Sequence, residues 1–224
     1  MLFPLGAFLL PAGLALVPIL QPGLGPWLVF LGGVTVLGLV DDLLAGEDSP
    51  RGLRGHGRAA LAGRPTTGAI KALGTAALAV YATAGVEGPE RLGQIGVLVL
   101  ATHLGNLLDL RPGRSEKALW LVLLATCIAG ATLEPLLLLA PFVVAVSAGA
   151  LLTLRERAML GDSGAGLIGA MIGVALVTTL GASATYAALA CLIAISLYGE
   201  FRSVASFIDR VPLLERLDSL GRSS

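Results

Sequence analysis

The first forty residues of this 224-residue chain contain no Asp, Glu, Lys or Arg. As one helix they would be roughly 60 Å long, about twice the thickness of a membrane's hydrocarbon core. The segment is therefore expected to fold back on itself, with Gln21-Pro22-Gly23 as the predicted turn. We expect no signal peptide here, because no basic residue precedes the apolar run and no cleavage pattern follows it.

Four further apolar stretches predict the other helices of an all-α polytopic membrane protein. Charged residues make up only 13% of the chain, whereas a soluble domain carries about 25%. Two stretches have the length of one span, and two are too long and must turn. Those turns are predicted at Glu134-Pro135, where proline cannot continue a helix, and at Gly181-Ala182-Ser183-Ala184. The total is eight transmembrane helices. The four stretches are residues 68–84, 92–108, 118–152 and 164–199.

The basic residues indicate the orientation of these helices. If eight spans alternate, fourteen of the fifteen Lys and Arg residues lie on one side and only Arg91 lies opposite. The positive-inside rule makes the rich side cytoplasmic. We expect a multi-pass protein of the inner (plasma) membrane, with both termini and the active face in the cytoplasm. Residues 1–200 form one predicted membrane domain, and 201–224 a cytoplasmic amphipathic tail along the membrane surface.

Asp41 and Asp42 end the second predicted span. Adjacent carboxylates repel each other, and their place at a helix C-terminus opposes the helix dipole. A solvated helix end is the structural alternative. The unfavourable placement favours a functional role for the pair.

A second polar group ends the fourth predicted span. Asn106 and Asp109 are three residues apart, so they share a helix face. Arg111 and Arg114 follow in a tight turn. Their guanidinium groups suit a phosphate, or they form salt bridges with the neighbouring aspartate.

The segment Gly161-Asp162-Ser163-Gly164 begins the seventh predicted span. Asp162 or Ser163 is a natural helix N-cap, which is the structural alternative. A carboxylate at this position can also hold Mg²⁺, which binds one or two carboxylates together with substrate phosphates. Asp162 is therefore the predicted metal ligand.

The first cytoplasmic loop is basic and leads to Lys71, at the start of the third span. It either contacts anionic lipid headgroups or binds a substrate phosphate. His56 and His103 are the only histidines and are too far apart in sequence to predict a zinc site. The loop arginines are Arg51, Arg54, Arg58 and Arg64.

Together these motifs resemble the polyprenyl-phosphate sugar-1-phosphate transferases, the family of phospho-N-acetylmuramoyl-pentapeptide transferase and undecaprenyl-phosphate GlcNAc-1-phosphate transferase. The resemblance covers about residues 25–200. It consists of an Asp-Asp pair, a lysine one loop later, an Asn-x-x-Asp segment and a Gly-Asp-Ser-Gly motif, in that order. The matching residues are Asp41, Asp42, Lys71, Asn106, Asp109 and Asp162.

The resemblance implies transfer of a phospho-sugar from a UDP-amino sugar to a polyprenyl phosphate, with Mg²⁺ as cofactor, for cell-envelope polymer synthesis. It implies catalytic roles for Asp41, Asp42 and Asp109 and metal binding by Asp162. Substrate binding would fall to Lys71, Asn106, Arg111 and Arg114. The expected partners are the polyprenyl phosphate, the UDP-sugar and the membrane, with a homodimer as a candidate assembly and no nucleic acid.

The chain departs from the family pattern in its fourth-span motif. His103 stands in place of the first asparagine, Leu110 replaces a glycine and Pro112 replaces the second aspartate. The histidine-rich cytoplasmic motif of many members is also missing. A non-catalytic descendant that binds lipid or assists membrane assembly is therefore the alternative. A transporter is less favoured, because these charges lie at span ends rather than in mid-span.

Overall fold

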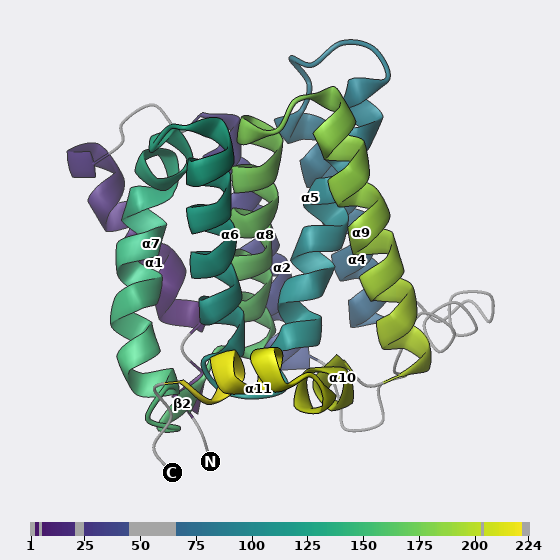
Figure 1. The fold of residues 1–224 in the computed structure, drawn as a ribbon. Coiled ribbons are helices and arrows are strands. Elements are labelled where there is room, and N and C mark those ends of the chain that lie inside the picture. Colours follow the sequence, from purple (N-terminus) through teal and green to yellow (C-terminus); the bar gives the residue numbers. More distant parts are fainter. Residues whose placement is uncertain (1–2, 5, 21–24, 45–65, 203, 221–224) are drawn as a thin grey trace.

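The computed structural model describes residues 3–4, 6–20, 25–44, 66–202 and 204–220. Within these ranges the chain forms eight helices of 15 to 20 residues (Figure 1). They are α1 (Gly6–Leu20), α2 (Pro26–Leu44), α4 (Thr67–Ala82), α5 (Glu90–Leu108), α6 (Arg114–Gly130), α7 (Glu134–Thr153), α8 (Gly161–Thr179) and α9 (Ala182–Phe201).

Shorter elements complete the described chain. Two short helices, α10 (Val204–Arg210) and α11 (Pro212–Ser219), follow the bundle. Strands β1 (Phe3–Pro4) and β2 (Ala158–Met159) form a parallel pair of two residues each. The prediction of an all-α fold is confirmed apart from this small pairing.

Two of the predicted turns are confirmed. Helix α7 begins at Glu134, with Pro135 in its first turn, where the missing N–H of proline costs no helical hydrogen bond. Helices α8 and α9 separate at Leu180 and Gly181, so the break is where it was expected, but the other three residues of the predicted turn belong to the first turn of α9. The turn predicted at residues 21–23 lies outside the described residues.

Four of the helices are long and apolar enough to cross a membrane: α2, α7, α8 and α9. Helix α4 is a shorter apolar helix. The prediction of a membrane protein is supported at this level. The full count of eight spans and the cytoplasmic side of the termini stay predictions.

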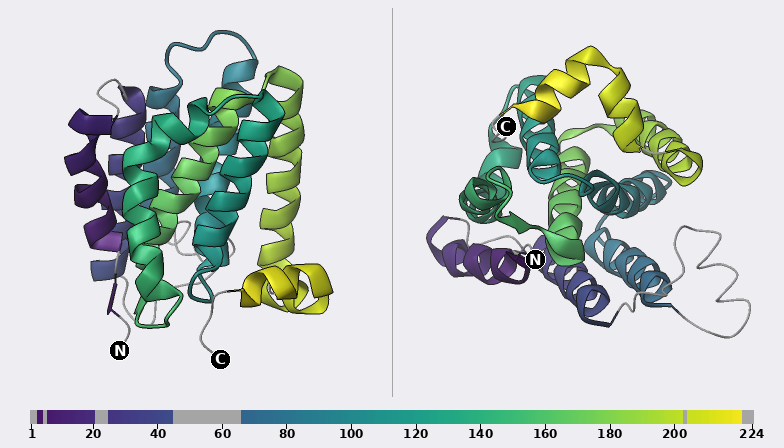
Figure 2. Two further views of the ribbon diagram at one scale, coloured as in Figure 1. Left: turned by 60° about the vertical axis from the view of Figure 1, so that its left-hand side comes forward. Right: turned by 90° about the horizontal axis from the view of Figure 1, so that it is seen from below.

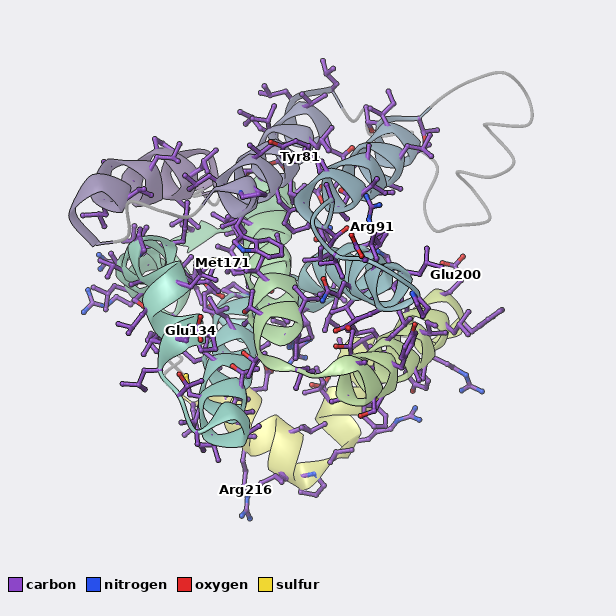
Figure 3. All side chains as sticks on the ribbon, turned by 90° about the horizontal axis from the view of Figure 1, so that it is seen from above. Tyr81, Arg91, Glu134, Met171, Glu200 and Arg216 are labelled. Atoms are coloured by element: carbon purple, nitrogen blue, oxygen red, sulfur yellow. The ribbon has the colours of Figure 1, made fainter. Side chains whose placement is uncertain are left out.

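Helix α8 is the centre of the bundle. Residues 163–175 are buried without interruption, and α8 packs against α5, α2, α6, α1 and α7. Figure 3 looks down the bundle with Met171 of α8 at its middle. An apolar helix that is buried all round needs small residues wherever its neighbours come close.

Glycines bring two neighbouring helices onto α8. A Cβ atom at Gly105 of α5 would collide with the carbonyl oxygen of Ala165, and one at Gly169 would collide with that of Ala101. A Cβ atom at Gly38 of α2 would lie 2.5 Å from the carbonyl oxygen of Asp162. These close approaches place the C-terminal ends of α2 and α5 beside the first turn of α8.

The C-terminal helices lie across one end of the bundle. Figures 1 and 2 show α10 and α11 running across the end at which α5 finishes and α6 starts. Arg216 of α11 points away from the bundle in Figure 3. We call α10 and α11 together the C-terminal strap.

Candidate functional site at the first turn of α8

Asp42, from the end of α2, caps the start of α8. Its Oδ1 accepts a hydrogen bond from the backbone N–H of Asp162 at 2.7 Å, and its Oδ2 accepts one from Ser163 at 3.0 Å. Gly161 has a φ of 69°, and a Cβ there would lie 3.0 Å from Asp42 Oδ2. The prediction that Asp162 or Ser163 is the N-cap is therefore wrong.

The dipole argument changes accordingly. The Asp42 carboxylate opposes the dipole of its own helix but faces the positive N-terminus of α8, where two free N–H groups receive it. The unfavourable position of Asp42 on α2 is therefore offset by its favourable position at the N-terminus of α8.

Lys71 of α4 joins three other helices. Its Nζ lies 2.5 Å from Asp162 Oδ1 on α8 and 3.5 Å from Asp41 Oδ2 on α2. It also donates to Asn106 Oδ1 on α5 at 3.4 Å. Lys71 is 9% exposed, and a buried ammonium needs such compensation because its desolvation is costly.

Asp109 follows the last residue of α5 and faces the same place. The pKa of its carboxyl group is raised to about 7, first by burial and then by neighbouring carboxylates. Those carboxylates are Glu116, Asp162 and Asp42. A hydrogen bond from the backbone of Gly161 acts in the opposite direction. Burial therefore favours the neutral form of Asp109 well above the pH at which a solvent-exposed aspartate ionises.

A cavity of about 480 Å³ opens beside these charges. Its polar end includes Asp41, Lys71, Asn106 and Asp162. Helices α4, α5 and α9 line its remaining walls, and along α5 the lining changes from polar to apolar over roughly 10 Å. The cavity thus connects the charged end of the bundle with its apolar interior.

Arg111 and Arg114 are engaged elsewhere. Arg114 is 4% exposed and forms a bidentate pair with Asp218, with Nε–Oδ1 at 2.8 Å and Nη2–Oδ2 at 3.0 Å. Arg111 contacts Asp209 at 3.1 Å and Asp218 at 3.7 Å. Lys117 donates to the carbonyl oxygen of Asp218.

This pairing differs from the salt-bridge interpretation, which expected the neighbouring aspartate as the partner. The carboxylates come from the C-terminal strap, and neither arginine lines the cavity. We therefore leave Arg111 and Arg114 out of the candidate site. The strap, predicted to lie along the membrane, is held against the bundle by these contacts.

The structure brings together six predicted residues: Asp41, Asp42, Lys71, Asn106, Asp109 and Asp162. It also adds residues that sequence reasoning missed. These are Ser196, Gly199 and Glu200 of α9, which line the cavity. His103, expected only as a departure from the family motif, lines it as well. Glu200 was detectable as the one acidic residue at the inner end of the last predicted span. The loop arginines and His56 lie outside the described residues.

The donor set fits a magnesium ion that is shared with a substrate. Among the described residues, no three His, Cys, Asp or Glu side chains are grouped to enclose a metal by themselves. Mg²⁺ usually takes only one or two carboxylates and completes its shell with phosphate and water oxygens. The Asp162 side chain is 41% exposed and meets this requirement, with Asp41 across Lys71.

No family model, curated protein or solved structure matches this chain. The function proposed below therefore rests on the motif resemblance together with the geometry of the residues that carry it.

Proposed function

We propose that this protein transfers a phospho-sugar from a UDP-amino sugar to a polyprenyl phosphate at the cytoplasmic face of the plasma membrane. The supporting observation is the convergence of α2, α4, α5 and α8. Each contributes a charged or amide side chain beside one cavity that continues into the apolar bundle. Such a cavity suits a substrate with an anionic head and a long apolar tail.

The proposed topology is eight spans with both termini in the cytoplasm. It places the candidate site on the side that carries fourteen of the fifteen basic residues. A water-soluble sugar nucleotide and a membrane lipid can meet there, because the charged end of the cavity faces the cytoplasm in this topology.

The reaction we propose is a displacement at phosphorus. An oxygen of the lipid phosphate attacks the sugar-linked phosphorus of the UDP-sugar, a new diphosphate bond forms, and the bond to the departing UMP breaks. Lys71 would offset the negative charge of the phosphates. Asp41 would orient the lipid phosphate, while Asp42 would keep the first turn of α8 in position.

Asp162 is the proposed magnesium ligand, with Asp41 as the second candidate. When bound, Mg²⁺ would stabilise the charge that develops on the leaving phosphate. Asn106 and Asp109 would border the nucleotide side of the site.

The test is turnover by the purified protein. We expect UMP release from one member of a panel of UDP-sugars when undecaprenyl phosphate and Mg²⁺ are both present. Asp162→Asn keeps the size of the side chain but removes its charge, so Mg²⁺-dependent turnover should be lost. Lys71 keeps Asp41 and Asn106 as partners, so the variant should still fold, with a lower thermal unfolding midpoint because one ion pair is lost. Thr126→Val is a distal control, since that hydroxyl bonds only within α6.

One observation favours the alternative of a non-catalytic lipid-binding descendant. Lys71 is already paired with two carboxylates, and no second aspartate follows Asp109 as in the family motif. Lipid phosphate binding without UMP release from any UDP-sugar would select this alternative.

A further inference from the structure

His103 is a cavity-lining side chain with no hydrogen-bond partner among the described residues. It lies on α5 one turn before Asn106, is half-buried, and is within electrostatic reach of Lys71 and Glu200. In the described part of the chain its imidazole makes no hydrogen bond or ion pair. A polar ring in this position is available to a ligand in the cavity.

The charged and amide donors at this end of the cavity are already engaged, whereas the Thr75 and Ser196 hydroxyl groups, which also line it, have no hydrogen-bond partner. The ammonium group of Lys71 serves Asp41, Asp162 and Asn106. The amide nitrogen of Asn106 donates to the carbonyl oxygen of Thr102 at 3.4 Å. An anionic group that enters the cavity can therefore accept a hydrogen bond from His103 without displacing an existing partner of that side chain.

The position of His103 along α5 indicates which part of a ligand it meets. Val99 and Leu100 line the cavity on the apolar side of His103, and Asn106 lines it on the charged side. His103 is about 4.5 Å deeper along the helix axis than Asn106. If the tail of a lipid lies along Val99 and Leu100, its head group lies next to His103. A sugar nucleotide arriving from water meets Asn106 and Asp162 first.

We propose that His103 binds the phosphate group of the lipid acceptor, donating an imidazole N–H to a phosphate oxygen. This inference rests on the proposed function and deepens it, because it assigns the acceptor phosphate to a residue that departs from the family pattern. The recognised chemistry is a phosphomonoester joined to an apolar chain. In this proposal His103 contributes to acceptor binding and takes no part in nucleotide binding.

Binding measurements without turnover test this assignment. Farnesyl phosphate and farnesol share one apolar chain and differ in the phosphate, so the pair isolates the phosphate contact. We expect His103→Ala to weaken farnesyl phosphate binding about tenfold, the loss typical of a hydrogen bond to a charged group. Its affinities for farnesol and for UDP should equal those of the wild type. His103→Asn keeps an N–H donor and should lose less.

Two further arms identify the source of the phosphate and control for folding. Inorganic phosphate should bind far more weakly than farnesyl phosphate, because it gains nothing from the apolar half of the cavity. Thr126→Val, a buried substitution in α6 away from the cavity, should bind every probe as the wild type does.

The outcomes are separable. If the wild type binds farnesyl phosphate no better than farnesol, the proposed lipid-phosphate function and this inference both fail. If the wild type prefers farnesyl phosphate and both His103 variants retain that preference, only the inference fails. The inference is also refuted if His103→Ala weakens farnesol binding as much as farnesyl phosphate binding, or if it weakens UDP binding. It is refuted as well if inorganic phosphate binds the wild type as tightly as farnesyl phosphate does.

Discussion

Replacing Asp218 with asparagine should release the C-terminal strap from the bundle without unfolding the bundle itself. Asp218 and Arg114 are 6% and 4% exposed, so both charges are almost wholly removed from water. Two hydrogen bonds of 2.8 and 3.0 Å join them. Removing one partner of a buried ion pair costs about 3–5 kcal/mol, because the other charge is left buried and uncompensated.

The structure offers a matched control in the same strap. Asp209 pairs with Arg111 at 3.1 Å, but these side chains are 38% and 44% exposed. An ion pair of that exposure contributes at most about 1 kcal/mol. Asp209→Asn removes the same chemical group from the same strap and should have a small effect.

Hydrogen exchange of the α11 amides is the suitable assay, because it reports local opening rather than global unfolding. A loss of about 3 kcal/mol corresponds to roughly hundredfold faster exchange in α11 for Asp218→Asn. Asp209→Asn should accelerate exchange by about fivefold at most, and exchange in α8 should stay unchanged in both. Equal, small effects of the two substitutions would refute the argument that burial makes the Arg114–Asp218 pair strong.

Two further predictions concern the first turn of α8 and its neighbours. The pKa of Asp109 in the folded protein lies about three units above its unfolded value of 3.8. The folded state therefore binds this proton more tightly than the unfolded state, and the free energy of unfolding should fall as the pH rises from about 4 to 7. Asp109→Asn should therefore unfold like the wild type near pH 4 and be more stable at pH 8, by up to about 4 kcal/mol; an equal difference at both pH values contradicts this. Asp42→Ala removes the cap of α8 and should destabilise the protein by about 1–2 kcal/mol in thermal unfolding, with Asp42→Asn losing less; no difference between the two would argue against capping.

Local sequence signals predicted the helix breaks well. Pro135 lies in the first turn of α7, where its missing N–H costs no helical hydrogen bond, and Gly181 directly precedes α9. The grouping of Asp41, Lys71 and Asp162 at one end of the bundle followed from the alternation of apolar and charged segments, which needs no knowledge of packing.

The individual partners could not be predicted in the same way. That Asp42 caps α8 depends on the contact between α2 and α8, which the missing side chain of Gly38 permits. That Arg114 pairs with Asp218 depends on a contact between residues 104 positions apart in the sequence. Sequence spacing predicts which residues share a face of one helix, but it does not identify the helix opposite.

In the proposed function, Lys71 couples the binding of the lipid phosphate to the binding of Mg²⁺. Its Nζ lies 2.5 Å from Asp162 Oδ1, so an incoming lipid phosphate that draws the ammonium away also frees the Asp162 carboxylate. Phosphate and Mg²⁺ should then bind cooperatively, and by linkage each should raise the affinity for the other by the same factor. We expect that factor to be about five or more, within the usual range of coupling between sites.

Lys71→Gln tests this coupling, because glutamine can still donate a hydrogen bond but carries no charge to exchange between partners. Farnesyl phosphate should bind the wild type more tightly with Mg²⁺ present, and Mg²⁺ should bind more tightly with farnesyl phosphate present. In Lys71→Gln no ammonium group pairs with the carboxylates. The affinity for Mg²⁺ should then be the same with and without farnesyl phosphate, and the affinity for farnesyl phosphate should be the same with and without Mg²⁺. Unchanged coupling in this variant would mean that Lys71 does not link the two ligands, and that the cation simply bridges Asp162 and the phosphate.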